Sequence, residues 1–199
     1  MSKLYFRYGA MNCGKTTALL QVAHNYEERD MKVVILKPKI DTKGNDKIVT
    51  RIGLKRKVDH LINKDENLNE YLNTLSKDIK CILVDEAQFL SRDQVDELFM
   101  FTKFKNTPVI CYGLRSDFKT LVFPGSLRLF EVCDELEELY TICRCGKKAK
   151  FNARIVNGKF TSSGSQVAID GEDEVSYESL CGKCYLEKVL NIKKENLNE

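Results

Sequence analysis

Residues 9–16 read Gly-Ala-Met-Asn-Cys-Gly-Lys-Thr, which is the pattern of a phosphate-binding P-loop. The two glycines let the backbone fold around an anion, while Lys15 reaches the phosphates and the Thr16 hydroxyl is offered to Mg²⁺. An apolar stretch at 4–8 precedes the pattern and an amphipathic run follows it. A helix that starts at the loop adds unpaired N–H groups and a positive dipole end. The residues predicted to bind phosphate are Gly9, Ala10, Met11, Asn12, Cys13, Gly14, Lys15, Thr16 and Thr17.

Composition narrows the class of protein. The chain has 199 residues, 43% of them apolar, enough for one large domain or one domain with a small appendage. Its net charge of +3, from 32 basic and 29 acidic residues, is too balanced to indicate a nucleic-acid partner. No segment resembles a signal peptide or approaches the roughly 20 apolar residues of a membrane span. We therefore expect a cytoplasmic protein with no membrane partner.

The charge is uneven in one segment. Between Lys37 and Lys57 there are eight Lys or Arg residues against two Asp. This local excess could attract a phosphorylated ligand, but a mobile solvated loop is the favoured interpretation.

Four short apolar runs, at 4–8, 33–36, 81–84 and 109–112, alternate with segments of helical character. This alternation predicts an α/β fold with a mostly parallel sheet and flanking helices. Helices are expected at 15–28 and 68–75, and a third after Ser91, which can form a capping box with Gln94.

The composition of the chain changes after about residue 140. Cysteine pairs, glycine and serine replace the regular alternation, and the end of the chain is polar. The sequence predicts a nucleotide-binding domain at 1–140, a second domain at 141–192 and a disordered tail at 193–199.

The apolar run at 81–84 ends in Asp85-Glu86, as a Walker B strand does. Ligands of open α/β sheets bind at the carboxyl ends of the strands, so Asp85 is expected to hold Mg²⁺ beside Thr16. Glu86 would orient water in an ATPase, or accept a proton from a substrate hydroxyl in a small-molecule kinase. Asp-Glu-Ala-Gln at 85–88 also resembles the second motif of DEAD-type helicases. The size of the chain argues against such a motor, because it needs two sheet domains.

Five apolar side chains belong to loops expected at the same sheet edge: Met11, Phe89, Leu114, Phe118 and Phe123. Together they could line a pocket for a flat aromatic ligand, although each alone is more typical of a core residue.

Four cysteines suit a structural Zn²⁺ with tetrahedral sulfur coordination: Cys143, Cys145, Cys181 and Cys184. The second pair has the usual C-x-x-C spacing, whereas the first is one residue short. A redox pair is less favoured because no thioredoxin-like context surrounds it. A zinc ribbon for nucleic acid is poorly supported.

Several motifs together resemble one family, the zinc-containing cytosolic type of thymidine kinase, especially its bacterial members. They are Ala-Met-Asn-Cys-Gly-Lys-Thr at 10–16, Thr-Arg-Ile-Gly at 50–53, Val-Asp-Glu-Ala-Gln-Phe-Leu at 84–90 and Cys-Tyr-Gly-Leu-Arg-Ser-Asp-Phe at 111–118. The first cysteine pair, within 141–149, also looks like the bacterial form. The resemblance runs from about residue 4 to residue 186. It implies a RecA-like P-loop domain followed by a small zinc-ribbon domain that carries a substrate loop, the lasso.

The resemblance also implies an activity and its residues. The activity is transfer of the γ-phosphoryl group of ATP to the 5′-hydroxyl of thymidine, with deoxyuridine as a second substrate, for nucleoside salvage. Glu86 matches the family's general base. The aromatic pair at 118 and 123 matches a lid loop, and Met11, Phe89 and Leu114 match walls of the nucleoside pocket.

The lasso would span about 157–177, with Val167, Ile169 and Gly171 near the base and Tyr177 near the sugar. Here the sequence departs from the family, which usually has two glycines where Asp-Gly stands at 170–171. Contacts between 170 and 176 are therefore left open, as are roles for Asp41 and Arg51. A homotetramer and feedback inhibition by thymidine triphosphate are implied by the resemblance alone.

Two other functions remain as alternatives. A nucleic-acid-dependent ATPase would be stimulated by DNA or RNA, although the chain lacks the basic balance this predicts. A regulatory module would bind nucleotide without turnover and leave Glu86 unused.

Overall fold

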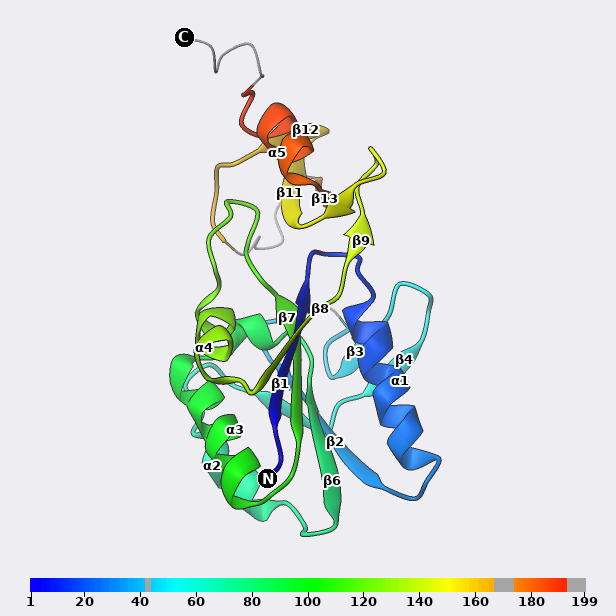
Figure 1. Ribbon diagram of the computed structural model, residues 1–199, viewed down its shortest axis with the longest axis vertical. Helices are drawn as coiled ribbons and strands as arrows, with labels where there is room; N and C mark the ends of the chain where they lie inside the picture. The colour runs from blue at the N-terminus through cyan, green and yellow to red at the C-terminus, as the bar shows by residue number, and fades with distance from the viewer. Residues whose placement is uncertain (42–43, 167–173, 193–199) are drawn as a thin grey trace.

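The centre of the molecule is a six-stranded sheet in which every pair of neighbouring strands is parallel. The structure is a computed structural model that describes residues 1–41, 44–166 and 174–192 (Figure 1). The strands follow the order β5-β2-β6-β7-β1-β8. Their bounds are β1 Leu4–Gly9, β2 Lys32–Pro38, β5 His60–Ile62, β6 Ile79–Val84, β7 Val109–Leu114 and β8 Glu135–Glu138.

The four predicted strands are the four at the middle of this sheet, so the predicted α/β fold is confirmed. The two outer strands, β5 and β8, were not predicted. β5 has three residues, and β8 reads Glu-Leu-Glu-Glu, a charged sequence that suits an edge strand and carries no apolar signal.

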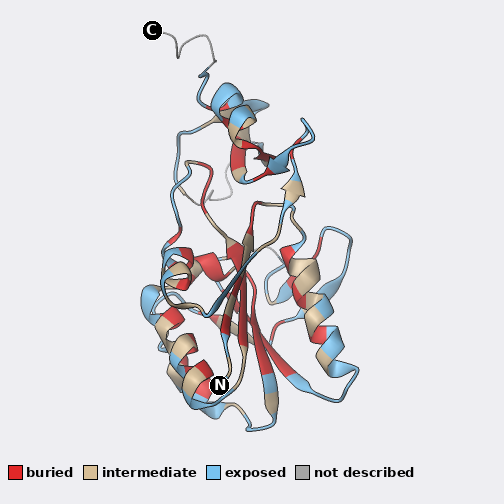
Figure 2. Ribbon diagram, viewed as in Figure 1, coloured by how far each residue is buried: buried red, intermediate tan, exposed pale blue. Residues whose placement is uncertain are grey.

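Helices cover both faces of the sheet (Figure 1). Helix α1 (Lys15–Glu27) packs Leu19 and Ala23 on one face. The other face is covered by α2 (Leu68–Thr74), α3 (Arg92–Phe104) and α4 (Pro124–Val132). Strands β2, β6 and β7 in the middle of the sheet are almost continuously buried, as Figure 2 shows. Two apolar layers thus fix the sheet and the loops at its ends.

The helix predicted to begin after Ser91 is α3, and the predicted capping box is present at its start. The Ser91 hydroxyl accepts a hydrogen bond from the Gln94 backbone N–H (3.1 Å), and the Gln94 side chain accepts one from the Ser91 N–H (3.0 Å). Helix α4 was missed, although Pro124 occupies its first turn.

At residues 47–57 the basic segment is a hairpin, so the expectation of a loop is wrong there, although most of its Lys and Arg residues are exposed. Strands β3 (Lys47–Val49) and β4 (Lys55–Lys57) form an antiparallel hairpin. Ile48 is buried in the same cluster as α1, and the Arg56 guanidinium binds both carboxylate oxygens of Glu27 on α1 at 2.8 and 2.5 Å.

The cysteine-bearing part lies beyond the carboxyl ends of the strands (Figure 1). It contains β9 (Thr141–Ile142), β10 (Lys148–Ala149), β11 (Phe151–Val156), β12 (Lys159–Thr161), β13 (Val175–Leu180), α5 (Gly182–Lys188) and its own apolar cluster. The division into domains at residue 140 stays a prediction, and the expected tail at 193–199 lies outside the described residues. Across the described ranges, no helix has the length and apolarity to cross a membrane.

Candidate active site

The predicted P-loop joins β1 to α1, as its sequence requires. Gly14 adopts φ +80° immediately before α1, a left-handed conformation that glycine accepts without strain. At Gly9 a Cβ atom would lie 2.2 Å from the Leu139 carbonyl oxygen, so only glycine fits there. The two glycines of the motif are therefore explained by backbone shape.

Lys15 is buried at the foot of the loop with 7% of its surface exposed. Its ammonium donates to the Ala10 carbonyl oxygen at 2.8 Å and lies 3.6 Å from the Cys13 sulfur. The ammonium is thus held at the loop by neutral partners, and an anion would bind it more strongly than they do.

The end of β6 brings two carboxylates to the same edge. Asp85 is 4% exposed, and burial together with the neighbouring Glu86 charge raises the pKa of the Asp85 carboxyl to about 7. The buried Asp85 carboxylate and the hydroxyl of Thr16, in the first turn of α1, are hard oxygen ligands of the kind that Mg²⁺ prefers, so the residues fit this ion.

Glu86 adopts φ +51°, which is rare for a residue other than glycine and is typical of functional positions. Its carboxylate accepts a hydrogen bond from the Gln88 side-chain amide at 2.6 Å. The side-chain carbonyl oxygen of Gln88 in turn accepts a hydrogen bond from the Leu114 backbone N–H at 3.0 Å. Gln88, which the sequence reasoning missed, therefore ties Glu86 to the end of β7.

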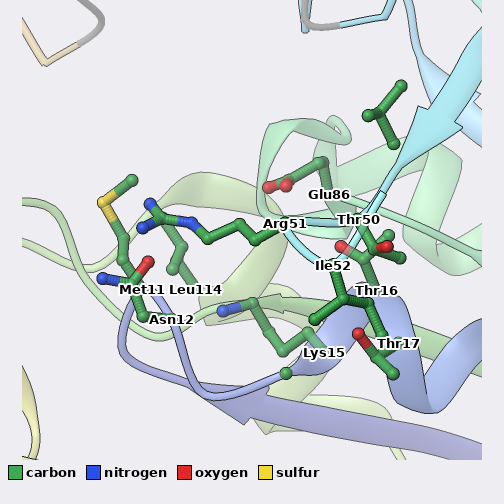
Figure 3. Close-up of a pocket in the computed structure, with 12 residues that line it drawn as sticks. Met11, Asn12, Lys15, Thr16, Thr17, Thr50, Arg51, Ile52, Glu86 and Leu114 are labelled. Atoms are coloured by element: carbon green, nitrogen blue, oxygen red, sulfur yellow. The ribbon is translucent and has the colours of Figure 1, made fainter. Parts of the chain in front are cut away.

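One pocket brings the predicted residues together. Glu86 faces Lys15 across it, Arg51 extends between the two, and Met11 and Leu114 lie together where the Arg51 side chain ends (Figure 3). Its described lining consists of Met11, Asn12, Gly14, Lys15, Thr16, Thr17, Val49, Thr50, Arg51, Ile52, Glu86 and Leu114. The residues at 49–52 were not predicted as lining, because the Lys and Arg residues around them favoured a solvated loop over a ligand-binding segment.

The predicted aromatic walls occupy two places. Phe89 and Phe123 pack edge to face with ring centroids 5.6 Å apart. Phe118 is 2% exposed and lies beneath the Arg154 guanidinium, 3.7 Å from the ring centroid. Their contacts with a nucleoside stay predictions.

Two residues of the cysteine-bearing part hold the P-loop backbone. The Asn152 side-chain carbonyl accepts the Met11 N–H at 2.8 Å, and the Ser179 hydroxyl donates to the Met11 carbonyl oxygen at 2.5 Å. Asn152 also donates to the Ser116 carbonyl oxygen at 2.9 Å. Because Asn152 and Ser179 are register partners on β11 and β13, one rigid strand pair makes all three bonds. No motif signalled these residues.

The four predicted cysteines converge. The sulfur atoms of Cys143, Cys145, Cys181 and Cys184 all lie within 4.8 Å of one another. Against the effect of burial, backbone N–H groups of Cys145 and Cys181 lower the pKa of the Cys143 thiol to about 7, which favours the thiolate form that binds metal. A set of four thiols at this spacing suits a tetrahedral metal ion.

The predicted lasso is described at its ends. Tyr177 lies on β13, where its hydroxyl accepts a hydrogen bond from the Arg154 side chain at 3.0 Å. Val167, Ile169 and Gly171, which were predicted to lie near the base, fall outside the described residues.

A parallel sheet with a P-loop and two carboxylates at its carboxyl edge defines a P-loop nucleotide-binding protein. The family model described as thymidine kinase matches residues 2–185. The thymidine kinase of Enterobacteria phage T4 is 44% identical over 92% of this chain and 95% of its own length. That of Haemophilus influenzae is 45% identical over 94% and 98%, respectively. This chain belongs to the thymidine kinase family.

The buried Asp85 predicts a pH-dependent stability. Its pKa is raised from 3.8 to about 7 in the folded state, because the ionised carboxylate is less stable when it is buried. Below pH 3.8 the group is protonated in both states and costs no stability, whereas above about pH 7 it is ionised in both states and the full cost of burying the charge lowers the free energy of unfolding. We expect Asp85→Asn, without Mg²⁺ or nucleotide, to raise the free energy of unfolding by about 2 kcal/mol near pH 8. The gain should shrink toward pH 5. Urea denaturation at both pH values measures it.

The matched control is Asp65→Asn, the same chemical change at an exposed position. An Asp85→Asn protein that is equally or less stable than the wild type near pH 8 would contradict a net cost of burying the ionised Asp85 carboxylate.

Proposed function

We propose that this chain transfers the γ-phosphoryl group of ATP to the 5′-hydroxyl of thymidine, with deoxyuridine as a second substrate, in nucleoside salvage. The observation that carries the proposal is a single pocket lined by the P-loop, by Lys15 and by the Glu86 carboxylate. Membership of the thymidine kinase family and relatives of that name from Haemophilus influenzae and phage T4 support it.

In the proposed reaction the 5′-oxygen of the nucleoside forms a bond to the γ-phosphorus. The bond from that phosphorus to the β,γ-bridging oxygen breaks, and its electron pair leaves with ADP. The proton of the 5′-hydroxyl passes to the Glu86 carboxylate, which the Gln88 amide orients. Lys15 exchanges the Ala10 carbonyl for the phosphates and compensates their charge.

Thr16 and Asp85 would hold Mg²⁺, which neutralises charge on the phosphate oxygens during transfer. The P-loop residues from Gly9 to Thr17 would bind the phosphates through backbone N–H groups. Exclusion of water from the pocket keeps ATP from being hydrolysed, so the nucleoside must be covered before transfer.

The nucleoside is proposed to lie on the Met11 and Leu114 side of the pocket, with Phe89, Phe118 and Phe123 as aromatic neighbours. Val167, Ile169, Gly171 and Tyr177 would complete this site from the lasso. We also propose that the cysteine cluster holds a structural Zn²⁺, that residues 141–192 act as one zinc-bearing domain, and that the protein is a cytoplasmic homotetramer.

Glu86→Gln should abolish the proton acceptor while keeping the shape of the side chain. We expect kcat for thymidine to fall by at least about 100-fold with little change in the KM for ATP. The measurement is Mg²⁺-dependent formation of monophosphate from thymidine, deoxyuridine, deoxycytidine and deoxyadenosine. Glu70→Gln on the exposed surface of α2 is the control.

Absence of nucleoside phosphorylation by the wild-type protein would refute the kinase activity. ATP hydrolysis stimulated by DNA or RNA would instead favour the ATPase alternative, and binding without turnover would favour the regulatory module.

Removal of zinc should weaken the binding of the nucleoside more than the binding of the nucleotide. The P-loop belongs to the sheet-bearing part and is tied to β11 and β13 through Met11, whereas the nucleoside is proposed to need the lasso between β12 and β13. We expect Cys145→Ala to weaken thymidine binding by roughly 30-fold and ADP binding by less than about tenfold. Calorimetry of both ligands, with zinc content measured in parallel, makes the comparison.

Cys133→Ala, which removes a thiol outside the cluster, should keep both the zinc and the affinities. Equal loss of the two affinities in Cys145→Ala, or no loss after zinc has gone, would count against this role of the metal.

A further inference from the structure

The tip of the β3–β4 hairpin forms one wall of the pocket opposite the P-loop. Arg51 lies at this tip, and its side chain extends across the pocket between the Glu86 carboxylate and the Lys15 ammonium (Figure 3). Its guanidinium ends on the side of Met11 and Leu114. Arg51 therefore bridges the phosphate side and the proposed nucleoside side of the pocket.

The hairpin that carries Arg51 is fixed to the helix that opens the P-loop. Arg56 binds Glu27 of α1 through two hydrogen bonds, and Ile48 and Val58 are buried against the same apolar cluster as α1. These contacts set the distance between the hairpin and the phosphate loop.

The turn at the tip is closed by its own hydrogen bonds. Thr50 is buried, and its hydroxyl accepts the Leu54 N–H at 2.9 Å. Gly53 completes the turn with φ +91°. The backbone on either side of Arg51 is therefore ordered, while the Arg51 side chain itself remains exposed to the pocket.

The positive charge of Arg51 suits a pocket that binds phosphate. Of the described lining residues, Lys15 and Arg51 are the two that carry positive charge, and they approach from opposite walls. Phosphoryl transfer spreads negative charge over the equatorial oxygens and the leaving oxygen. The planar guanidinium can donate two parallel hydrogen bonds to such oxygens, and it approaches them from the wall opposite the Lys15 ammonium.

We propose that Arg51 is a catalytic residue that donates hydrogen bonds to the transferring phosphoryl group and stabilises its charge in the transition state. The inference rests on the proposed kinase activity and deepens it. Arg51 neither gains nor loses a proton. It acts while the 5′-oxygen bonds to the γ-phosphorus and the electron pair of the broken bond passes to ADP.

The test compares Arg51→Ala and Arg51→Lys with Lys57→Ala, which removes one positive charge from an exposed site of the same hairpin. We expect Arg51→Ala to lower kcat by about 1,000-fold while the KM for ATP and the affinity for ADP stay within about threefold. Arg51→Lys should keep less than about a tenth of the wild-type kcat. Lys57→Ala should match the wild type.

Two further measurements separate contact with the phosphoryl group from a structural effect. The wild-type protein with ADP, thymidine and fluoroaluminate should form a tight transition-state complex that Arg51→Ala does not form. Free guanidinium ion should partly restore the kcat of Arg51→Ala and leave that of Glu86→Gln unchanged.

An Arg51→Ala enzyme with near wild-type kcat, or one that loses ADP affinity in proportion to kcat, would overturn the assignment. So would Arg51→Ala that still traps fluoroaluminate. If the wild-type protein phosphorylates no nucleoside, the kinase proposal fails and this assignment fails with it. Wild-type turnover with an unaffected Arg51→Ala removes the Arg51 assignment alone.

Discussion

The backbone of Met11 is the point on which the rest of the site depends. Its N–H and C=O are both taken by the β11–β13 strand pair, through Asn152 and Ser179. Asn152 extends the same network to the Ser116 carbonyl after β7. A loop that must wrap an anion is thus shaped partly by the cysteine-bearing part of the chain. The phosphate side of the pocket and the proposed nucleoside side consequently share one support.

Several groups at this edge of the sheet sit in conformations or environments that cost stability. Asp85 is a buried carboxylate with a raised pKa, and Glu86 has a left-handed backbone. The buried Arg154 is held by stacking on Phe118 and by a hydrogen bond to Tyr177. Such groups persist because the two apolar layers of the sheet overdetermine the fold, and they are expected where charge is to be bound.

The sequence predicts the parts whose signal is local. The P-loop, the Asp-Glu pair after β6 and the Ser91 cap each depend on residues a few positions apart, and the structure has them as predicted. The hairpin at 47–57 was missed because its sequence is dominated by lysines and arginines, and Ile48 is its one buried apolar residue. Asn152 and Ser179 were missed because their partner, Met11, lies more than 140 residues away. Contacts of that range leave no periodic pattern.

The most direct test of this shared support is the affinity of Asn152→Ala for ADP, measured by calorimetry on protein in which the proposed zinc site is occupied. The substitution frees the Met11 N–H and leaves the cysteine cluster intact. If the strand pair shapes the phosphate loop, ADP affinity should fall by about tenfold, the worth of one well-placed hydrogen bond. Unchanged ADP affinity in a zinc-loaded Asn152→Ala protein would contradict the dependence of the P-loop on this contact.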